Sequence, residues 1–152
     1  MTAVSDSSPL IALTQIGEGG LLQRLFTEVV IPPAVQAEIA PSLPELPRWI
    51  SVLSLTGSLH PQTLGGVLGR GEQETITLAI ELGATRVILD DGPARRVANS
   101  LGLPVIGTLG ILLAAKRRGL IKHLRPHLDA LVNAGFFLGP ALLESVLRQA
   151  GE

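Results

Sequence analysis

The fold is decided by a short stretch near the N-terminus, which reads Ala3-Val-Ser-Asp-Ser-Ser-Pro9. Residues 3–6 favour a short strand. Ser8 followed by Pro9 favours a helix start, with the serine as its cap and the proline in its first turn. A strand that passes directly into a helix is the beginning of a βαβ unit. We therefore expect a strand over 3–6 and a helix over 9–16.

The same alternation of strand and helix continues along the chain. We expect further strands at 28–31, 49–55, 87–89 and 104–106, and helices at 21–26, 33–40, 72–82, 93–101 and 109–118. Such alternation is typical of right-handed βαβ units, which build a parallel sheet with helices on both faces. The predicted fold is α/β, a three-layer α/β/α sandwich with a mainly parallel central sheet.

Beyond Gly119 the sequence pattern is helical only. Two helices are expected, at 120–134 and 140–150, joined by a turn over 135–139. Neither helix is long enough to bury a core of its own, so we interpret them as an extension of the core at about 3–118. Because 152 residues is an ordinary size for one domain, we expect a single domain over 1–152.

The composition excludes several classes of function. The chain has no cysteine, which removes disulfides, thiolate zinc sites, iron–sulfur clusters and cysteine nucleophiles. His123 and His127 share a helical spacing but have no third ligand at a familiar distance. No apolar stretch approaches the roughly 20 residues that cross a bilayer, so we expect no membrane association and a cytoplasmic location.

The small net charge of −1 hides a division along the chain. Residues 1–91 contain ten acids and four arginines, whereas residues 92–128 contain seven basic residues and no acid. A basic segment of this kind suits a polyanionic partner, although solvated helix faces would also produce it.

Acidic residues follow two of the predicted strands. Asp6 ends the first strand, and Asp90 and Asp91 end the strand at 87–89. In open parallel sheets ligands bind beyond the carboxyl ends of the strands, so these side chains are expected at one edge. Glu72, in the first turn of its helix, and Glu38, one to two turns into another, can reach the same edge.

Carboxylates gathered at one edge repel one another unless a cation lies between them. Oxygen ligands without Cys or His favour Mg²⁺ or Mn²⁺. Such an ion deprotonates a water and stabilises charge on a phosphodiester during in-line displacement. The candidate metal ligands and catalytic residues are the five acids Asp6, Glu38, Glu72, Asp90 and Asp91.

Each acid also has a purely structural interpretation. Asp6 can form a local turn with Ser8, Glu72 can complement its helix dipole, and Asp91 can cap the helix at 93–101. The joint pattern of strand ends and helix starts favours the metal site over these separate explanations. Glu74 lies about 200° from Glu72 around the helix, so we expect it to face solvent or a neighbouring helix.

Other polar residues lie near the predicted site. Ser7, Ser8 and Thr108 carry hydroxyls that can orient the acids or bind phosphate, with capping as the more ordinary role for Ser8. Arg95 and Arg96 follow the paired aspartates on a helix and are the candidate contacts to the phosphates of a polyanionic partner, which the resemblance described next implies to be RNA.

At these residues the chain resembles the PIN-domain superfamily, whose bacterial members include VapC-type toxins. The resemblance follows the order of the acids, from Val-Ser-Asp6 and Val-Gln-Ala-Glu38 through Gly-Glu72-Gln-Glu to Val-Ile-Leu-Asp-Asp91, and it covers about 3–118. It looks closest to a poorly characterised branch with Gly-Glu-x-Glu, Leu-Asp-Asp and Ile-Gly-Thr-Leu-Gly stretches, in which the helical tail also belongs to the pattern.

The resemblance implies a metal-dependent ribonuclease, often paired with an antitoxin and frequently a homodimer. Two departures are visible: the third acid is Glu72 rather than Asp, and Leu89-Asp90-Asp91 replaces the usual Thr-x-Asp. Counting back from Val97 favours Asp91 as the principal ligand, whereas the strand end favours Asp90.

The sequence therefore predicts a Mg²⁺- or Mn²⁺-dependent endoribonuclease that acts as the toxin of a toxin–antitoxin pair. The alternative is a catalytically inactive PIN-like scaffold that binds protein or RNA. With only 3% aromatic residues, contacts to RNA are expected mainly at phosphates. A nucleotide-binding α/β domain is disfavoured, because no glycine-rich loop follows the first strand.

Overall fold

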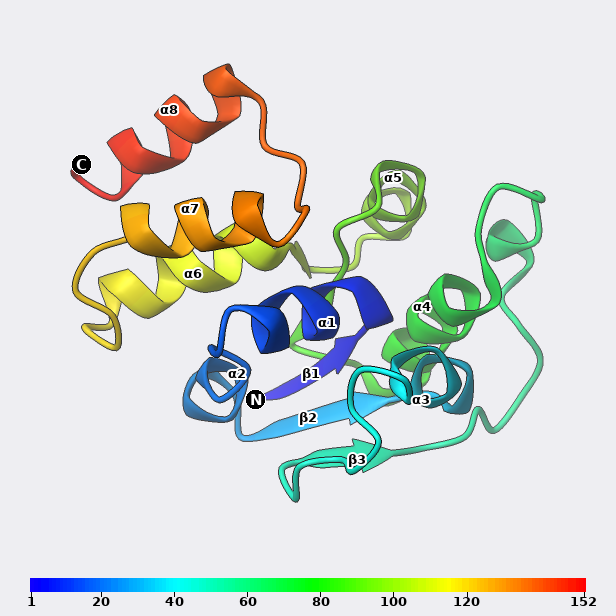
Figure 1. Ribbon diagram of the computed structural model, residues 1–152. Helices are drawn as coiled ribbons and strands as arrows, with labels where there is room; N and C mark the ends of the chain where they lie inside the picture. The colour runs from blue at the N-terminus through cyan, green and yellow to red at the C-terminus, as the bar shows by residue number, and fades with distance from the viewer.

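The computed structural model describes all residues 1–152 and has a five-stranded, all-parallel sheet with helices on both faces (Figure 1). The strand order is β3-β2-β1-β4-β5. The strands are β1 (Thr2–Ser5), β2 (Glu28–Ile31), β3 (Ile50–Val52), β4 (Arg86–Ile88) and β5 (Val105–Ile106). The predicted α/β/α fold is confirmed.

Eight α-helices and one short 3-10 helix connect and flank the strands. They are α1 (Ser7–Gln15), α2 (Leu21–Leu25), α3 (Pro33–Ile39), the 3-10 helix at Pro61–Thr63, α4 (Arg70–Leu82), α5 (Gly92–Ser100), α6 (Thr108–Arg117), α7 (Arg125–Asn133) and α8 (Pro140–Gln149). None of them is long and apolar enough to cross a membrane.

Alternating side chains of the strands enter two separate cores. In β1, Ala3 belongs to the core on the side of α1, whereas Val4 belongs to the core beneath α4 and α5. In β4 the same alternation places Ile88 and Val87 on opposite faces. All four residues are at most 1% exposed. Because helices cover both faces of the sheet, its strands need apolar residues on both faces.

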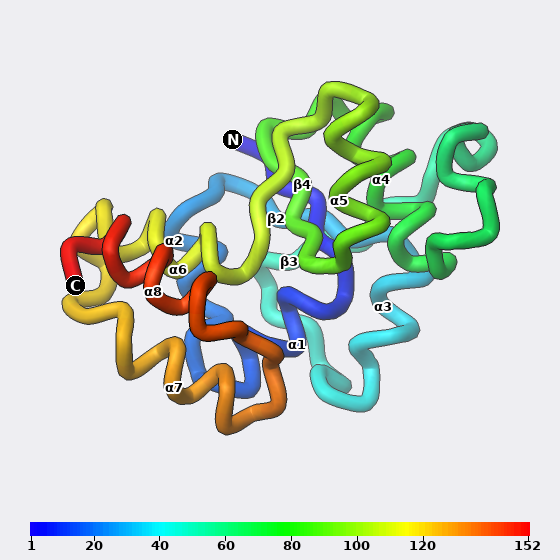
Figure 2. The backbone as a smooth tube through the Cα atoms, turned by 90° about the horizontal axis from the view of Figure 1, so that it is seen from above, coloured from blue at the N-terminus to red at the C-terminus, as the bar shows by residue number.

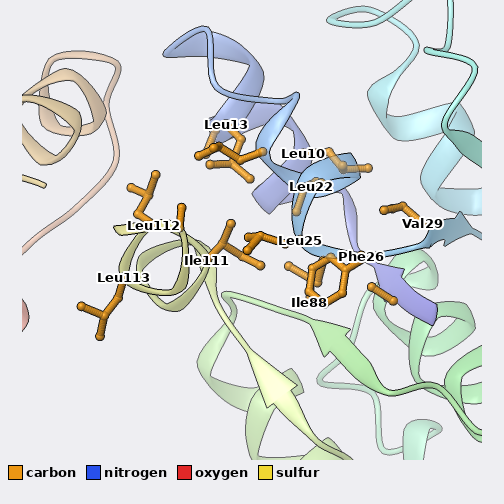
Figure 3. Close-up of a cluster of buried hydrophobic side chains, with 14 of the residues drawn as sticks. Leu10, Leu13, Leu22, Leu25, Phe26, Val29, Ile88, Ile111, Leu112 and Leu113 are labelled. Atoms are coloured by element: carbon orange, nitrogen blue, oxygen red, sulfur yellow. The ribbon is translucent and has the colours of Figure 1, made fainter. Parts of the chain in front are cut away.

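The larger core unites α1, α2 and α6 with the sheet. Figure 3 shows Leu10, Leu22, Ile88 and Ile111 directed toward one another from these elements. The C-terminal helices belong to the same core, because the buried Leu128 and Val146 are part of it. The two helices lie beside α6, on the side of the molecule opposite the loop between β3 and α4 (Figure 2).

Several predicted boundaries are wrong. The first helix begins at Ser7 rather than Pro9, with Asp6 at the N-cap position, so Ser8 does not cap it. Pro9 is therefore the third residue of the helix rather than the first, and it is tolerated there because the first-turn N–H groups have no partner within a helix. The helix expected over 120–134 begins only at Arg125, since Gly119, at φ 73°, turns the chain after α6.

Candidate metal centre

The candidate site lies where the order of the strands reverses. β1 pairs with β2 on one side and with β4 on the other. The connection from β1 leads to β2 and that from β4 leads to β5, so the two connections run toward opposite edges of the sheet. A crevice at the carboxyl ends of two such strands is the usual ligand site of an open α/β sheet. Asp6 directly follows β1 and donates its backbone N–H to the carbonyl of Ile88, at 3.0 Å, which ties the two strand ends together.

Asp6 is the most buried of the predicted acids. Its side chain is 3% exposed, and its Oδ1 atom has no hydrogen-bond partner. Burial raises the pKa of Asp6 from 3.8 to about 6; the backbone N–H of Ser7 works against this rise, and the charges of Glu38, Asp90 and Asp91 add to it. A buried carboxylate oxygen without a donor is costly and needs a proton or a cation.

Glu38 reaches this crevice from α3, where Gly71 of α4 makes room for it. A Cβ added at Gly71 would overlap Glu38 Oε1 and lie 3.3 Å from Asp6 Oδ1. The absence of a side chain at Gly71 therefore lets two carboxylates converge at one point. Burial and the charge of Glu74 raise the pKa of Glu38 above its usual value.

Glu72 lies next to Gly71 in the first turn of α4. Its Oε1 accepts a hydrogen bond from the backbone N–H of Gly69, at 2.9 Å. Glu72 therefore also has a structural role, because this bond satisfies a backbone donor at the start of α4. Burial raises the pKa of Glu72 to about 7 despite the Gly69 bond, and the carboxylates of Asp91 and Asp6 contribute further to the rise. Asp91 lies within hydrogen-bond reach of Glu72.

The paired aspartates after β4 have different local roles. Asp90 is held at the N-terminus of α6, where Thr108 donates its backbone N–H to Oδ1, at 2.8 Å, and its hydroxyl to Oδ2, at 2.5 Å. Asp91 caps α5, because its Oδ2 accepts from the backbone N–H of Ala94, at 3.0 Å. One Asp91 oxygen is left for another ligand, whereas both Asp90 oxygens are already oriented by Thr108.

The two serines after Asp6 differ in exposure. Ser7 is buried in the first turn of α1, beside the carboxylate of Asp6, whereas Ser8 is exposed. Among the three predicted hydroxyls, Thr108 is the one with a direct hydrogen bond to a predicted acid.

Of the two predicted phosphate contacts, Arg95 lies near Asp90. Arg95 donates one guanidinium N–H to the carbonyl of Leu89, at 2.8 Å, and a Cβ at Gly107 would lie 2.7 Å from its Nη1 and 2.8 Å from Asp90 Oδ1. Arg96 is exposed on the same helix. Lys116, at the other end of α6, is bound to Glu152 and to the carbonyl of Ala150. The basic segment is thus divided between two regions.

The acids at the strand ends, Asp6, Glu38, Glu72, Asp90 and Asp91, offer the oxygen ligands that a divalent cation prefers. Their side chains do not surround a common point closely enough to bind one as they stand. No group of three or more His, Asp or Glu residues converges closely enough to hold a metal ion as the side chains stand. The fit rests on the unpartnered Oδ1 of Asp6, on the space at Gly71, and on an all-oxygen donor set.

Sequence reasoning missed the close approach at Gly71, and it expected Glu74 to face solvent or a neighbouring helix without foreseeing its bonds to α3. Glu74 is 8% exposed and faces the neighbouring helix, where it accepts from the N–H of Ala34, at 3.1 Å, and from Arg70 Nε, at 2.6 Å. It fixes the start of α3, and with it the helix that carries Glu38. Gly71 was the available signal, since glycine in a helix costs about 1 kcal/mol relative to alanine and is kept where groups approach closely.

Comparison with known proteins agrees with this architecture. A family model described as a PIN domain matches residues 2–152. A PilT N-terminus domain protein from the hyperthermophilic archaeon Sulfolobus solfataricus P2 has a similar solved structure, with a TM-score of 0.52 and 21% identity over 76% of this chain and 93% of that chain. No curated relative matches significantly. With its parallel sheet and the acids at its strand ends, the chain belongs to the PIN-domain family.

Proposed function

We propose that this protein is a Mg²⁺- or Mn²⁺-dependent endoribonuclease whose ion is held by Asp6, Glu72, Asp90 and Asp91, with Glu38 completing the site. One observation carries the proposal: Asp6 is buried with an unpartnered oxygen amid acids that raise its pKa. A cation relieves this repulsion, whereas a purely structural role leaves it uncompensated.

When bound, a divalent cation supplies an activated water and neutralises charge that develops on the phosphodiester. The chain's own residues prepare the site for it. Thr108 fixes the orientation of Asp90, the start of α4 positions Glu72, and Gly71 lets Glu38 approach Asp6. Arg95 and Arg96, on the helix after Asp91, are placed to attract the phosphates of RNA.

The biological role we propose is that of a toxin, paired with an antitoxin and acting as a homodimer in the cytoplasm. Support for this role comes from the resemblance to VapC-type toxins. A neighbouring reading frame for a small DNA-binding protein, together with growth arrest on expression of wild type but not of Asp6→Asn, is the expected result. Growth that is equally affected by both forms would contradict a toxin role based on cleavage.

The second candidate function is a PIN-like scaffold that binds protein or RNA without cleaving it. It is favoured by the open arrangement of the acids, none of which is grouped closely enough to hold an ion as it stands. The two candidates differ in turnover and in metal response.

The test is cleavage of a fluorescent single-stranded RNA in Mn²⁺ or Mg²⁺. Glu72→Gln keeps the size and acceptor of the side chain but removes a ligand charge, so we expect a loss of roughly a hundredfold or more. Asp6→Asn is expected to be inactive, and Asp129→Asn, an exposed acid on α7, serves as the matched control with wild-type activity. Equal rates in wild type, Glu72→Gln and Asp6→Asn would refute the nuclease and favour the scaffold.

A further inference from the structure

A cavity of about 530 Å³ lies where β5, α6 and α8 meet. Its walls are mostly apolar, with Ile106 of β5, Leu109 and Leu113 of α6, and Val146 of α8. The volume falls within the range of sites for small organic ligands. The cavity is therefore large enough to take a group of the size of a nucleobase.

The cavity is continuous with the candidate metal centre. Asp90, which raises the pKa of Asp6, forms part of its wall, and so does Arg95. Arg95 uses one guanidinium N–H for the carbonyl of Leu89, and its other donors can bind a phosphate. A polyanionic chain whose phosphate lies at Asp90 and Arg95 would have its adjoining nucleoside at the mouth of the cavity.

Aromatic side chains are concentrated here. The chain has three phenylalanines and one tryptophan, and two of these four residues, Phe136 and Phe137, line this one cavity from the segment between α7 and α8. Phe137 is 90% exposed, so most of its ring is not packed against the rest of the protein and is free to stack on a ligand. Stacking on an aromatic ring is the general means by which proteins hold unpaired bases.

We propose that this cavity is a base-binding subsite, which receives the unpaired base of the RNA nucleotide adjoining the phosphate that is cut. The inference deepens the proposed nuclease function and rests on it. The position of Arg95 favours a nucleic acid over a protein segment. The cavity combines an apolar, aromatic wall for a base with the guanidinium of Arg95, beside Asp90, for a phosphate. Phe137 supplies the stacking surface, and the acids at the strand ends lie on the phosphate side.

The test measures binding in EDTA, where no metal-dependent cleavage takes place. Fluorescence anisotropy compares a short single-stranded RNA with a strand of equal length made of abasic nucleotides. Because both ligands carry the same phosphates, repulsion from the acid cluster cancels in the ratio of their affinities. We expect wild type to prefer the strand with bases by about tenfold, in the range of one stacked base.

Three variants distinguish stacking from other effects. Phe137→Ala is expected to lose the preference, Phe137→Trp is expected to retain it, and Val132→Ala, an exposed apolar residue outside the cavity, is expected to leave it unchanged. Melting curves of the three variants check that none of the substitutions affects folding. An unchanged preference in Phe137→Ala would overturn the proposal, as would loss of a protein dimer in this variant with unchanged RNA affinity.

The outcome is separable from that of the nuclease proposal. Base-dependent binding that depends on Phe137, in a protein that never cleaves RNA, would retain the subsite and reject the nuclease. Metal-dependent cleavage with no contribution from Phe137 to affinity would retain the nuclease and reject the subsite.

Discussion

Replacing Asp6 with asparagine should stabilise the metal-free protein, even though it removes a residue of the candidate site. The change preserves the shape of the side chain and eliminates its charge. Burial and the neighbouring acids raise the pKa of Asp6 from 3.8 to about 6, and each unit corresponds to about 1.36 kcal/mol. Ionised Asp6 therefore costs the folded state about 3 kcal/mol at pH 8, an amount that asparagine does not incur.

The sign of the pH dependence follows from the same shift. Between about pH 4 and pH 6 the folded state retains a proton on Asp6 that the unfolded chain has lost, so the free energy of unfolding falls as pH rises through this window. Below it, the stabilities of wild type and Asp6→Asn should be similar. Above it, the variant should be more stable by the full amount, equivalent to roughly 6 to 12 °C for a domain of this size.

The assay is thermal or urea unfolding in EDTA at pH 4 and pH 8, with Asp129→Asn as the control for loss of an exposed acid. Millimolar Mn²⁺ at pH 8 should raise the melting temperature of wild type and not that of Asp6→Asn, because an ion that binds only the native wild type stabilises it by mass action. An Asp6→Asn variant that is no more stable than wild type in EDTA at pH 8 would refute the reasoning.

Three other substitutions have expected outcomes. Gly71→Ala should abolish stabilisation by Mn²⁺, because the added methyl group displaces Glu38, while the helix itself forms more readily; an unchanged metal-induced thermal shift would contradict this. Thr108→Val should reduce RNA cleavage by about tenfold, because a hydrogen bond worth about 1.5 kcal/mol that orients the Asp90 carboxylate is lost, and the melting temperature should fall by about 3 to 6 °C; rates equal to wild type would show that this orientation is unimportant. Arg95→Ala combined with Arg96→Ala should weaken RNA binding and lower its dependence on salt, measured by anisotropy at several salt concentrations, and an unchanged slope would place the phosphate contacts elsewhere.

Most of the fold was predictable because local patterns and tertiary packing agree. The apolar strand residues around Val87 need burial on both faces, which only a covered parallel sheet provides, and Gly83, at φ 60°, ends α4 as a C-terminal glycine does. The strand order was not predicted, since periodicity does not determine the side to which each crossover returns. The cap of α1 was misassigned because Asp6 and Ser8 are both good capping residues.

The site was predictable where it depends on strand ends and not where it depends on contacts between helices. The positions of Asp6 and Asp91 follow from the parallel sheet alone. The close approach of Glu38 to Gly71, and the bond from Ala34 to Glu74, join helices that are separated by more than thirty residues in the chain. The low aromatic content also misled, because a composition averages over the chain and does not show that two rings line one cavity.

The most direct test of the central claim is calorimetric titration with Mn²⁺ at pH 6.5 in two buffers of different ionisation enthalpy. Because the pKa values of Asp6 and Glu72 are raised to about 6 and about 7, metal binding should displace protons from them, and the number released should decrease toward zero at pH 8.5. Glu72→Gln should bind Mn²⁺ more weakly and release fewer protons. Absence of Mn²⁺ binding to wild type, or binding without proton release at pH 6.5, would contradict a metal centre built from these carboxylates.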